Sequence, residues 1–194
     1  MDTEKLEPLL SYQGIDRLYE YDPSKKHLDS LMDQYELHEI IADDIVELST
    51  QDKIDVYDQC LFVVLHFPKY DKAANRYYGN EFNMILGKNY IITLTNYHTQ
   101  HMIKLKETLL ADLQEADASE KHKISPYYLL YRIMDTMYDK TLNSLSNFTK
   151  ELRTIETNIF RSQRLDKNLI EQIMLRKRSA VNLKHMFLPH QDII

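Results

Sequence analysis

The chain has 194 residues, with 24 Lys and Arg against 30 Asp and Glu and a formal net charge of −6, a length that suits one α/β domain with an appendage. Only three Gly and five Pro argue against an all-β sandwich, a collagen-like or disordered chain and a glycine-rich nucleotide loop. The longest apolar run, residues 60–65, is far shorter than the about 20 residues that cross a bilayer. The single cysteine excludes an intrachain disulfide and fits a reducing compartment, so we expect a soluble, cytosolic chain.

Charge is distributed unevenly along the sequence. Residues 1–60 hold sixteen Asp and Glu against five Lys and Arg, whereas residues 161–185 hold seven Lys and Arg against two acids. We therefore expect an acidic head that attracts cations and a basic arm. Considered one by one, most of these charged side chains are expected simply to lie on the solvated surface.

The first part of the chain predicts one strand and two short helices. Residues 1–14 predict at most a short edge element. Ile15–Tyr21 alternates as a strand does and is followed by Asp22-Pro23, a turn signal. Ser24 can cap a short helix, and isoleucines and leucines at helical spacing predict a second helix over residues 37–48.

The middle of the chain predicts a mixed sheet. Residues 56–67 are rich in β-branched and aromatic residues, which predicts a central strand covered on both faces and ended by Pro68. Residues 81–86 and 90–95 flank Gly87-Lys88-Asn89, a short hairpin connection with Gly and Asn available for positive φ. A helix over residues 99–113 and a charged linker then complete an α/β or α+β pattern.

A long helix predicted over residues 125–161 organises the rest of the chain. Ser125 is a good N-cap, and Pro126 suits the first helical position. From Met134 to Ile159, apolar or small residues recur in steps of four and three, which is typical of a coiled-coil seam. At ~1.5 Å per residue the helix is about 55 Å long, roughly twice what a compact domain of this size buries, so we expect part of it to project.

A projecting helix needs a partner, and the next segment supplies one. Asp166 can cap a second helix over residues 166–194, and the short polar link 162–164 predicts an antiparallel helical hairpin. Arg176 interrupts the apolar face of this helix, and Arg176-Lys177-Arg178 is expected to lie on a solvated face. An ordinary helical bundle packed on the rest of the chain is the alternative.

The expected organisation is therefore α/β (α+β), with a head domain and a helical arm. The head covers residues 1–115, and the linker and arm cover residues 116–194. The arm holds the two helices, at about 125–161 and 166–194.

No catalytic constellation is evident in the sequence. It contains no P-loop, G-x-G-x-x-G, G-x-S-x-G or H-E-x-x-H motif, so we expect no enzyme. His98 and His101 could share a helix face and ligate a metal, but they lack an evident third ligand and are more simply surface histidines. Cys60 is most simply a buried small hydrophobe.

Asp43 and Asp44 are the metal candidates. They lie beside Glu39 and Glu47, and carboxylate oxygens are the ligands that Mg²⁺ and Ca²⁺ prefer. Adjacent helix residues diverge by about 100°, so one chain is not expected to chelate with both, whereas a site shared between two chains is easier. Exposed acids on a polar helix face are the alternative.

Five segments of the sequence, taken together, resemble the pattern of a known protein family. They are YELHEIIADDIV (35–46), KIDVYD with LFVVL (53–65), LGKNYIITL (86–94), SPYYLLYRIMD (125–135) and LKHMFLPHQDII (183–194). Each is weak alone. In this order and spacing they resemble the CorA family of divalent-cation channels, from roughly residue 15 to the last residue.

The resemblance implies a cytoplasmic αβα domain with paired helical arms, from a homopentameric channel of the inner membrane that carries Mg²⁺ or Co²⁺. It implies that Asp44 lies between protomers and helps to bind regulatory Mg²⁺. It further implies that metal there stabilises the closed ring and that metal loss lets the ring open. The implied partners are divalent cations, further copies of the chain and the membrane region of the channel; no nucleic acid is expected.

The chain also departs from the family pattern. It lacks the two membrane helices and the Gly-Met-Asn tripeptide of the pore mouth, so we expect a soluble fragment that cannot conduct ions alone. Residues 158–167 are basic where the family is often acidic, which argues against cation sensing at the tip of the arm. Asp52 replaces the usual proline before Lys53, which we interpret as a minor change in a turn.

Two other functions fit the same residues. One is the cytoplasmic domain of a zinc-transporting (ZntB-like) relative, in which His98 and His101 count for more because imidazole favours Zn²⁺. The other is a free-standing cytosolic scaffold that binds a partner protein through its helical hairpin.

Overall fold

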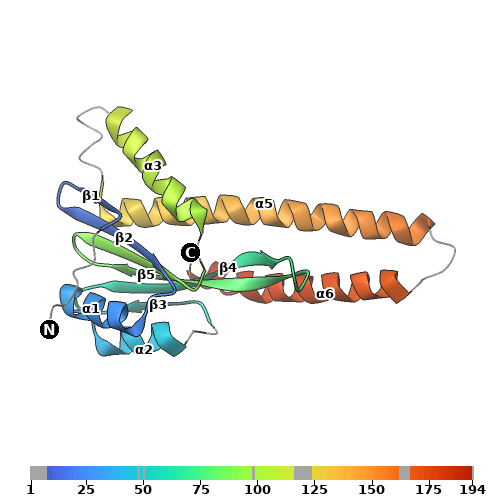
Figure 1. Cartoon of the computed structure of the whole chain (residues 1–194), viewed down its shortest axis with the longest axis horizontal. Helices are drawn as coiled ribbons and strands as arrows, with labels where there is room; N and C mark the ends of the chain where they lie inside the picture. Colours follow the sequence, from blue (N-terminus) through green and yellow to red (C-terminus); the bar gives the residue numbers. More distant parts are fainter. Residues whose placement is uncertain are drawn as a thin grey trace.

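The chain folds into a mixed β-sheet with helices on both faces and a long helical hairpin beside it (Figure 1). The computed structural model describes residues 8–47, 49, 51–97, 99–115, 124–161 and 167–193. The strands in this part of the chain are β1 (Leu10–Tyr12), β2 (Ile15–Tyr21), β3 (Lys53–Val56), β4 (Leu61–Asp71), β5 (Arg76–Leu86) and β6 (Tyr90–Thr95). The helices are α1 (Lys25–Tyr35), α2 (Glu39–Glu47), α3 (Gln100–Glu115), α5 (Pro126–Arg161), α6 (Lys167–Phe187) and α7 (His190–Ile193).

The sheet has the strand order β1-β2-β6-β5-β4-β3 within the described residues. Strands β2 and β6 are parallel, and the other neighbours are antiparallel. The predicted strand Ile15–Tyr21 and the predicted edge element before it are confirmed. Ser24 caps α1 as predicted, because its Oγ accepts the N–H of His27 at 3.2 Å.

Residues 56–67 are not one strand. Strand β3 ends at Val56, and the chain reverses before β4, which pairs antiparallel with it. The backbone N–H of Tyr57 donates to the carbonyl of Cys60 at 2.9 Å and closes the turn. The polar pair Asp58-Gln59 lies inside the run and supplies that turn, so the apolar pattern extends across two strands.

Pro68 does not end the strand either. Strand β4 continues through Pro68 to Asp71 and pairs with β5 along its whole length, with Pro68 opposite Gly79. Strand β3 covers β4 only as far as Val64. Beyond that point β4 is an edge strand, where a residue without an N–H is tolerated. The result is a long β4–β5 hairpin that reaches past the rest of the sheet.

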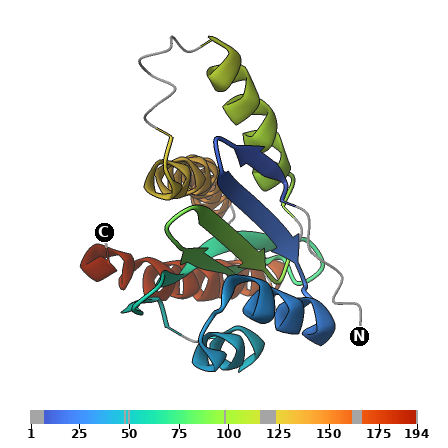
Figure 2. The ribbon, with the colours of Figure 1, turned by 90° about the vertical axis from the view of Figure 1, so that its left-hand side faces the viewer.

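The sheet is covered on both faces, as predicted, although β4 is not central: it lies beside the edge strand β3. Val63, Leu65 and Phe67 of β4 pack with α3 and α5. Phe62 and Val64, which alternate with them, pack with α1 and α2. Figure 2 shows the helices on either side of the strands. The head is therefore an αβα sandwich built on the two-residue period of a strand.

The hairpin connection at residues 87–89 joins β5 to β6 as predicted, but for another reason. None of these residues has a positive φ. A Cβ on Gly87 would overlap the ring of Tyr90. Glycine is needed there because an aromatic ring lies against the backbone.

Helices α5 and α6 form the predicted antiparallel hairpin, which extends past the tip of the β4–β5 hairpin (Figure 1). Ser125 caps α5, since its Oγ accepts the N–H of Tyr128 at 3.1 Å. Farther along the chain, Leu152 and Ile159 of the predicted seam line a cavity of about 400 Å³ with residues of α6, and both are partly open to solvent. Nearer the sheet, Tyr77 of β5 packs with residues of both helices, among them Phe148, Leu183 and Phe187.

Arg176 does not lie on a solvated face. Its Nε is 3.0 Å from Oε2 of Glu151 on α5. Its two terminal nitrogens donate to the carbonyl and the side-chain oxygen of Asn75, both at 2.8 Å. Asn75 lies in the β4–β5 turn with a φ of 49°. Arg176 thus ties the turn to both helices, while Lys177 and Arg178 are exposed as predicted. The predicted linker at 116–123, the link at 162–164 and the cap Asp166 lie outside the described residues.

Candidate metal-binding surface

Helix α2 positions the two candidate carboxylates. It begins after His38, whose carbonyl and Nδ1 accept the N–H groups of Ile41 and Ile40 at 3.0 and 3.2 Å. Ile41 and Ile45, four residues apart, are buried on the sheet and exposed by 0% and 7%. This contact fixes the rotation of α2, and with it the directions of Asp43 and Asp44.

Asp44 points to strand β3. Its Oδ2 accepts a hydrogen bond from Nζ of Lys53 at 2.6 Å, and the same ammonium group is 2.9 Å from Oδ2 of Asp55. Burial lowers the pKa of Lys53, but the hydrogen bonds to Asp44 and Asp55 outweigh it and raise that pKa above its usual value. Lys53 therefore supplies Asp44 with a positive charge from within the chain.

Asp43 points to solvent on another side of α2. It is exposed and lies three residues from both Ile40 and Val46, which are 50% and 65% exposed. Residues three apart share a helix face, so Asp43 lies between two exposed apolar side chains. A carboxylate that faces outward between apolar residues is suited to contact with another molecule.

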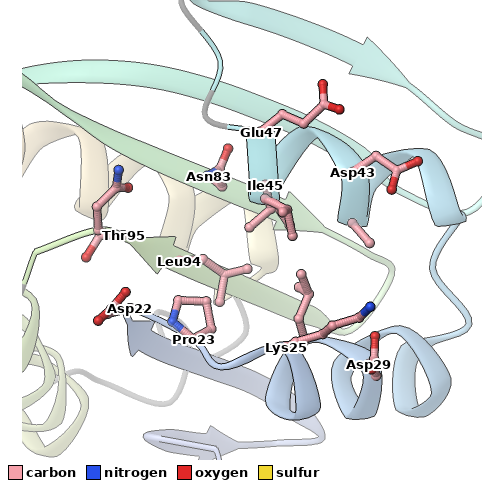
Figure 3. A pocket seen from close by; sticks show the side chains of 14 residues that line it. Asp22, Pro23, Lys25, Asp29, Asp43, Ile45, Glu47, Asn83, Leu94 and Thr95 are labelled. Carbon is pink, nitrogen blue, oxygen red and sulfur yellow. The ribbon is translucent and has the colours of Figure 1, made fainter.

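A cavity of about 570 Å³ lies beside Asp43, between α1, α2 and the ends of β2 and β6. In Figure 3 the carboxylates of Asp43 and Glu47 lie at its rim and point away from Ile45 and Leu94, which form part of its apolar wall. Within the described part of the chain, no group of three or more His, Cys, Asp or Glu side chains could hold a metal ion. A metal at this surface would need ligands from water or from a second molecule.

Among the described residues, His101 and Cys60 do not join a group of side chains that could hold a metal ion. His98 lies outside the described residues. His101 is mostly exposed on α3, but its partial burial and the nearby Lys140 and Lys104 lower its pKa. The surrounding charges therefore oppose a bound cation. Cys60 is buried, and burial raises the pKa of its thiol, which fits a small core residue.

Sequence reasoning missed a buried ionic cluster around Asp52. The side chain of Asp52 is only 2% exposed, and its Oδ1 is 2.6 Å from Nδ1 of His66. Its Oδ2 is 3.0 Å from Nε2 of His190. The interpretation of Asp52 as a minor change in a turn is therefore wrong. The only signal available in the sequence was the departure from proline at this position.

A family model described as CorA-like Mg²⁺ transporter protein matches residues 19–194. The chain belongs to the CorA-like family. The resemblance inferred from the five segments is thereby confirmed.

A curated relative of this CorA-like chain is the cobalt/magnesium transport protein CorA of Thermotoga maritima. The two are 20% identical over 158 residues, which cover 81% of this chain and 43% of the relative. The chain spans about half the length of the curated relatives it matches. No helix among the described residues is long and apolar enough to cross a membrane.

Two solved structures share the fold of the CorA-like chain. One is the soluble domain of CorA from Methanocaldococcus jannaschii, with a TM-score of 0.74 and 15% sequence identity. The match covers 92% of this chain and 68% of the chain in that structure. Another is the ZntB cytoplasmic domain from Vibrio parahaemolyticus, with a TM-score of 0.66 and 12% sequence identity. The match covers 97% of this chain and 68% of the chain in that structure. The αβα head with a long helical hairpin is thus an architecture that this chain shares with both.

Proposed function

We propose that this chain is the cytoplasmic regulatory part of a divalent-cation transporter that carries Mg²⁺ or Co²⁺. Mg²⁺ binds at Asp43 and Asp44, at the contact between two copies of the chain, and this binding gates transport through the membrane part of the full, homopentameric transporter. Membership of the CorA-like family supports this proposal, as does the name of the Thermotoga maritima relative.

The observation that carries the proposal is the exposed carboxylate of Asp43 between Ile40 and Val46. On the neighbouring strand β3, Ile54 and Val56 are also exposed, by 41% and 82%. Exposed apolar side chains around a polar site are typical of contacts between proteins. A second copy seated here would bury these side chains and bring further oxygen ligands to the acids.

The chemistry of the acidic pair suits Mg²⁺. This ion is usually held by one or two carboxylates and keeps several water ligands. Asp43 offers both of its oxygens, and Asp44 offers Oδ1 while Oδ2 accepts from Lys53. Mg²⁺ that binds only between copies adds free energy only to the associated state, so it shifts the population toward the closed ring.

Sedimentation velocity with and without millimolar Mg²⁺ tests the site. We compare the wild-type chain with Asp43→Asn, Asp44→Asn and the control Asp139→Asn, which removes an exposed acid from α5 on the other side of the sheet. We expect Mg²⁺-dependent association in the wild-type and control chains, and its loss in the two site variants. The proposed site would be contradicted if the mass of the wild-type chain did not change with Mg²⁺. It would also be contradicted if both site variants still associated in Mg²⁺.

Zinc transport is the second candidate, because the ZntB domain shares the fold. Oxygen ligands favour Mg²⁺, whereas imidazole favours Zn²⁺. The same experiment repeated with micromolar Zn²⁺ and a His101→Gln variant separates the two. Association driven by Zn²⁺ and lost in His101→Gln would favour the zinc transporter.

A further inference from the structure

A buried ionic cluster joins the end of the described chain to the sheet. Asp52 lies just before β3, and its side chain is 2% exposed. Its Oδ1 accepts from the backbone N–H of His66 on β4 at 2.9 Å and lies 2.6 Å from Nδ1 of the same residue. One carboxylate thus holds both the backbone and the ring of His66.

The ring of His66 has a second carboxylate on its other side. Glu81 is opposite His66 in the β4–β5 register, its side chain is 3% exposed, and its Oε2 is 3.6 Å from Nε2 of His66. Oε1 of Glu81 accepts from the side-chain amide of Asn83 at 2.7 Å. The imidazole therefore lies between two buried carboxylates.

His190 of α7 binds to this cluster. Its Nε2 is 3.1 Å from the carbonyl oxygen of His66 and 3.0 Å from Oδ2 of Asp52. A carbonyl oxygen only accepts, so Nε2 carries a hydrogen. Nδ1 of His190 is 2.6 Å from the hydroxyl of Tyr138 on α5, which can donate to it. The rings of Phe67, Tyr138 and Phe187 lie edge-on around His190.

The charge of His66 decides whether this cluster is stable. When the ring is protonated, both nitrogens carry hydrogens and each faces a carboxylate. When the proton leaves, one nitrogen presents a lone pair to a carboxylate, and two buried negative charges lose their counter-charge. Burial lowers the pKa of His66, but Asp52 and Glu81 outweigh it and raise that pKa to about 9.

Solvent can reach the ring. A cavity of about 250 Å³ is lined by Asp52, His66, Tyr78 and His185, together with residues of α6 and the segment that follows it. The side chain of His66 is 18% exposed. The proton can therefore exchange while both carboxylates stay almost fully buried.

We propose that Asp52, His66, Glu81 and His190 form a proton-sensitive latch, in which the proton on His66 fastens α7 and the end of α6 to the sheet, and loss of that proton above neutral pH loosens them. The titratable groups that face His66 are Asp52 before β3, Glu81 of β5, His190 of α7, and Tyr78 and His185 at the cavity. Tyr138 of α5 faces His190. The latch goes beyond metal sensing, because it needs neither a metal nor a second copy.

The sign of the pH dependence follows from the direction of the shift. The pKa of His66 is raised in the folded chain from 6.5 to about 9, so its contribution is complete below pH 6.5 and is lost as the pH rises through about 9. The folding constant is expected to fall roughly 300-fold over that window. Tyr138 keeps its proton there, because burial and the charge of Asp52 raise its pKa to about 12.

Two measurements on the whole chain test the latch. NMR titration of the His66 ring gives its pKa directly. Urea unfolding and amide exchange of α6 and α7, measured between pH 6 and pH 9.5, give the stability and the local opening. We compare the wild type with His66→Gln, which keeps a donor but cannot be charged, and with the control His185→Gln, which removes the exposed histidine of the same cavity.

We expect His66 to titrate near pH 9, and the protection of α6–α7 amides to fall relative to α3 as the pH rises through that value. His66→Gln should lose this pH dependence, whereas His185→Gln should keep it. If His66→Gln does not fold, Asp52→Asn serves instead and should lower the titration point of His66. Titration of wild-type His66 near pH 6.5, or the same pH dependence in His66→Gln, would overturn the latch.

Discussion

Arg17 is a charged residue that the fold buries completely. It is 0% exposed on β2, and Nη2 donates to the carbonyl of Met102 on α3 at 3.0 Å. Among the residues that the structure describes, its Nε and Nη1 have no hydrogen-bond partner. Burial lowers the pKa of Arg17 to about 10, which means that the fold disfavours its charge. Removal of one partner from a buried charge is costly, but replacement of the charge itself by an apolar side chain is often stabilising.

Arg17→Met is therefore expected to stabilise the chain by about 1–3 kcal/mol, since the flexible apolar side chain fills the space without a buried charge. Urea unfolding at pH 7 measures the change. The conservative variant Arg17→Lys is the control and should not stabilise, because it keeps the charge. Destabilisation of Arg17→Met by more than 1 kcal/mol would instead mean that the guanidinium is well solvated in its site.

The elements of the fold meet through side chains that no single element predicts. The β4–β5 hairpin reaches between α5 and α6, where Tyr77 packs on Phe148 in an edge-on geometry and donates through its hydroxyl to the carbonyl of Ser144 at 3.3 Å. Asn182 of α6 donates to the carbonyl of Tyr77 at 3.3 Å. The helical hairpin is thus held by the sheet as well as by its own contacts. The division into a head at 1–115 and an arm at 116–194 stays a prediction.

Arg176→Ala is expected to loosen this junction. It removes the ion pair to Glu151 and both hydrogen bonds to Asn75. The net contribution of hydrogen bonding to a charged group is about 1.5–3 kcal/mol. We expect a net loss of about 2 kcal/mol in urea unfolding. The matched control is Arg178→Ala on the exposed face of the same helix, for which a change within about 0.5 kcal/mol is expected. Equal losses of unfolding free energy in the two variants would show that the contacts of Arg176 do not stabilise the junction.

The charges and exposed side chains around α2 favour the proposed association of copies. The acidic pair on α2 lies beside exposed apolar side chains on α2 and β3. Lys53 forms an ion pair with Asp44 within the chain. In the proposed function Mg²⁺ binds Oδ1 of Asp44 while Lys53 stays on Oδ2, so the charge of the lysine opposes the cation and raises the Mg²⁺ concentration at which copies associate.

Lys53→Met should accordingly favour association. An ion pair at a partly exposed site is worth up to about 1 kcal/mol, so the Mg²⁺ concentration at half-association should fall by up to about fivefold. Sedimentation velocity across a Mg²⁺ series measures it, with Lys72→Met in the β4–β5 turn as the control. An unchanged or raised Mg²⁺ requirement would argue that Asp44 is not a ligand.

Much of the architecture could be predicted from local signals. Ser24 and Ser125 cap their helices, Ile15–Tyr21 is a strand, and the long helix and its antiparallel partner are present. These features depend on residues close together in the sequence, and they also carry the family resemblance. The directions of Asp43 and Asp44 could not be predicted, because a shift of one residue on a helix changes the face by about 100°.

The roles of Pro68, Asp52 and Arg176 depend on packing between segments that lie far apart in the sequence. Pro68 continues a strand because β3 pairs with β4 only as far as Val64, so among the described strands this part of β4 has a partner on one side alone, namely β5. Asp52 and His66 depend on His190, which lies 124 residues after His66, and Arg176 depends on a turn 101 residues before it. Local patterns in the sequence determine where strands and helices form, because backbone preferences and capping act over a few residues. They do not determine which polar side chains become buried together, because that depends on contacts which exist only once the distant segments have packed.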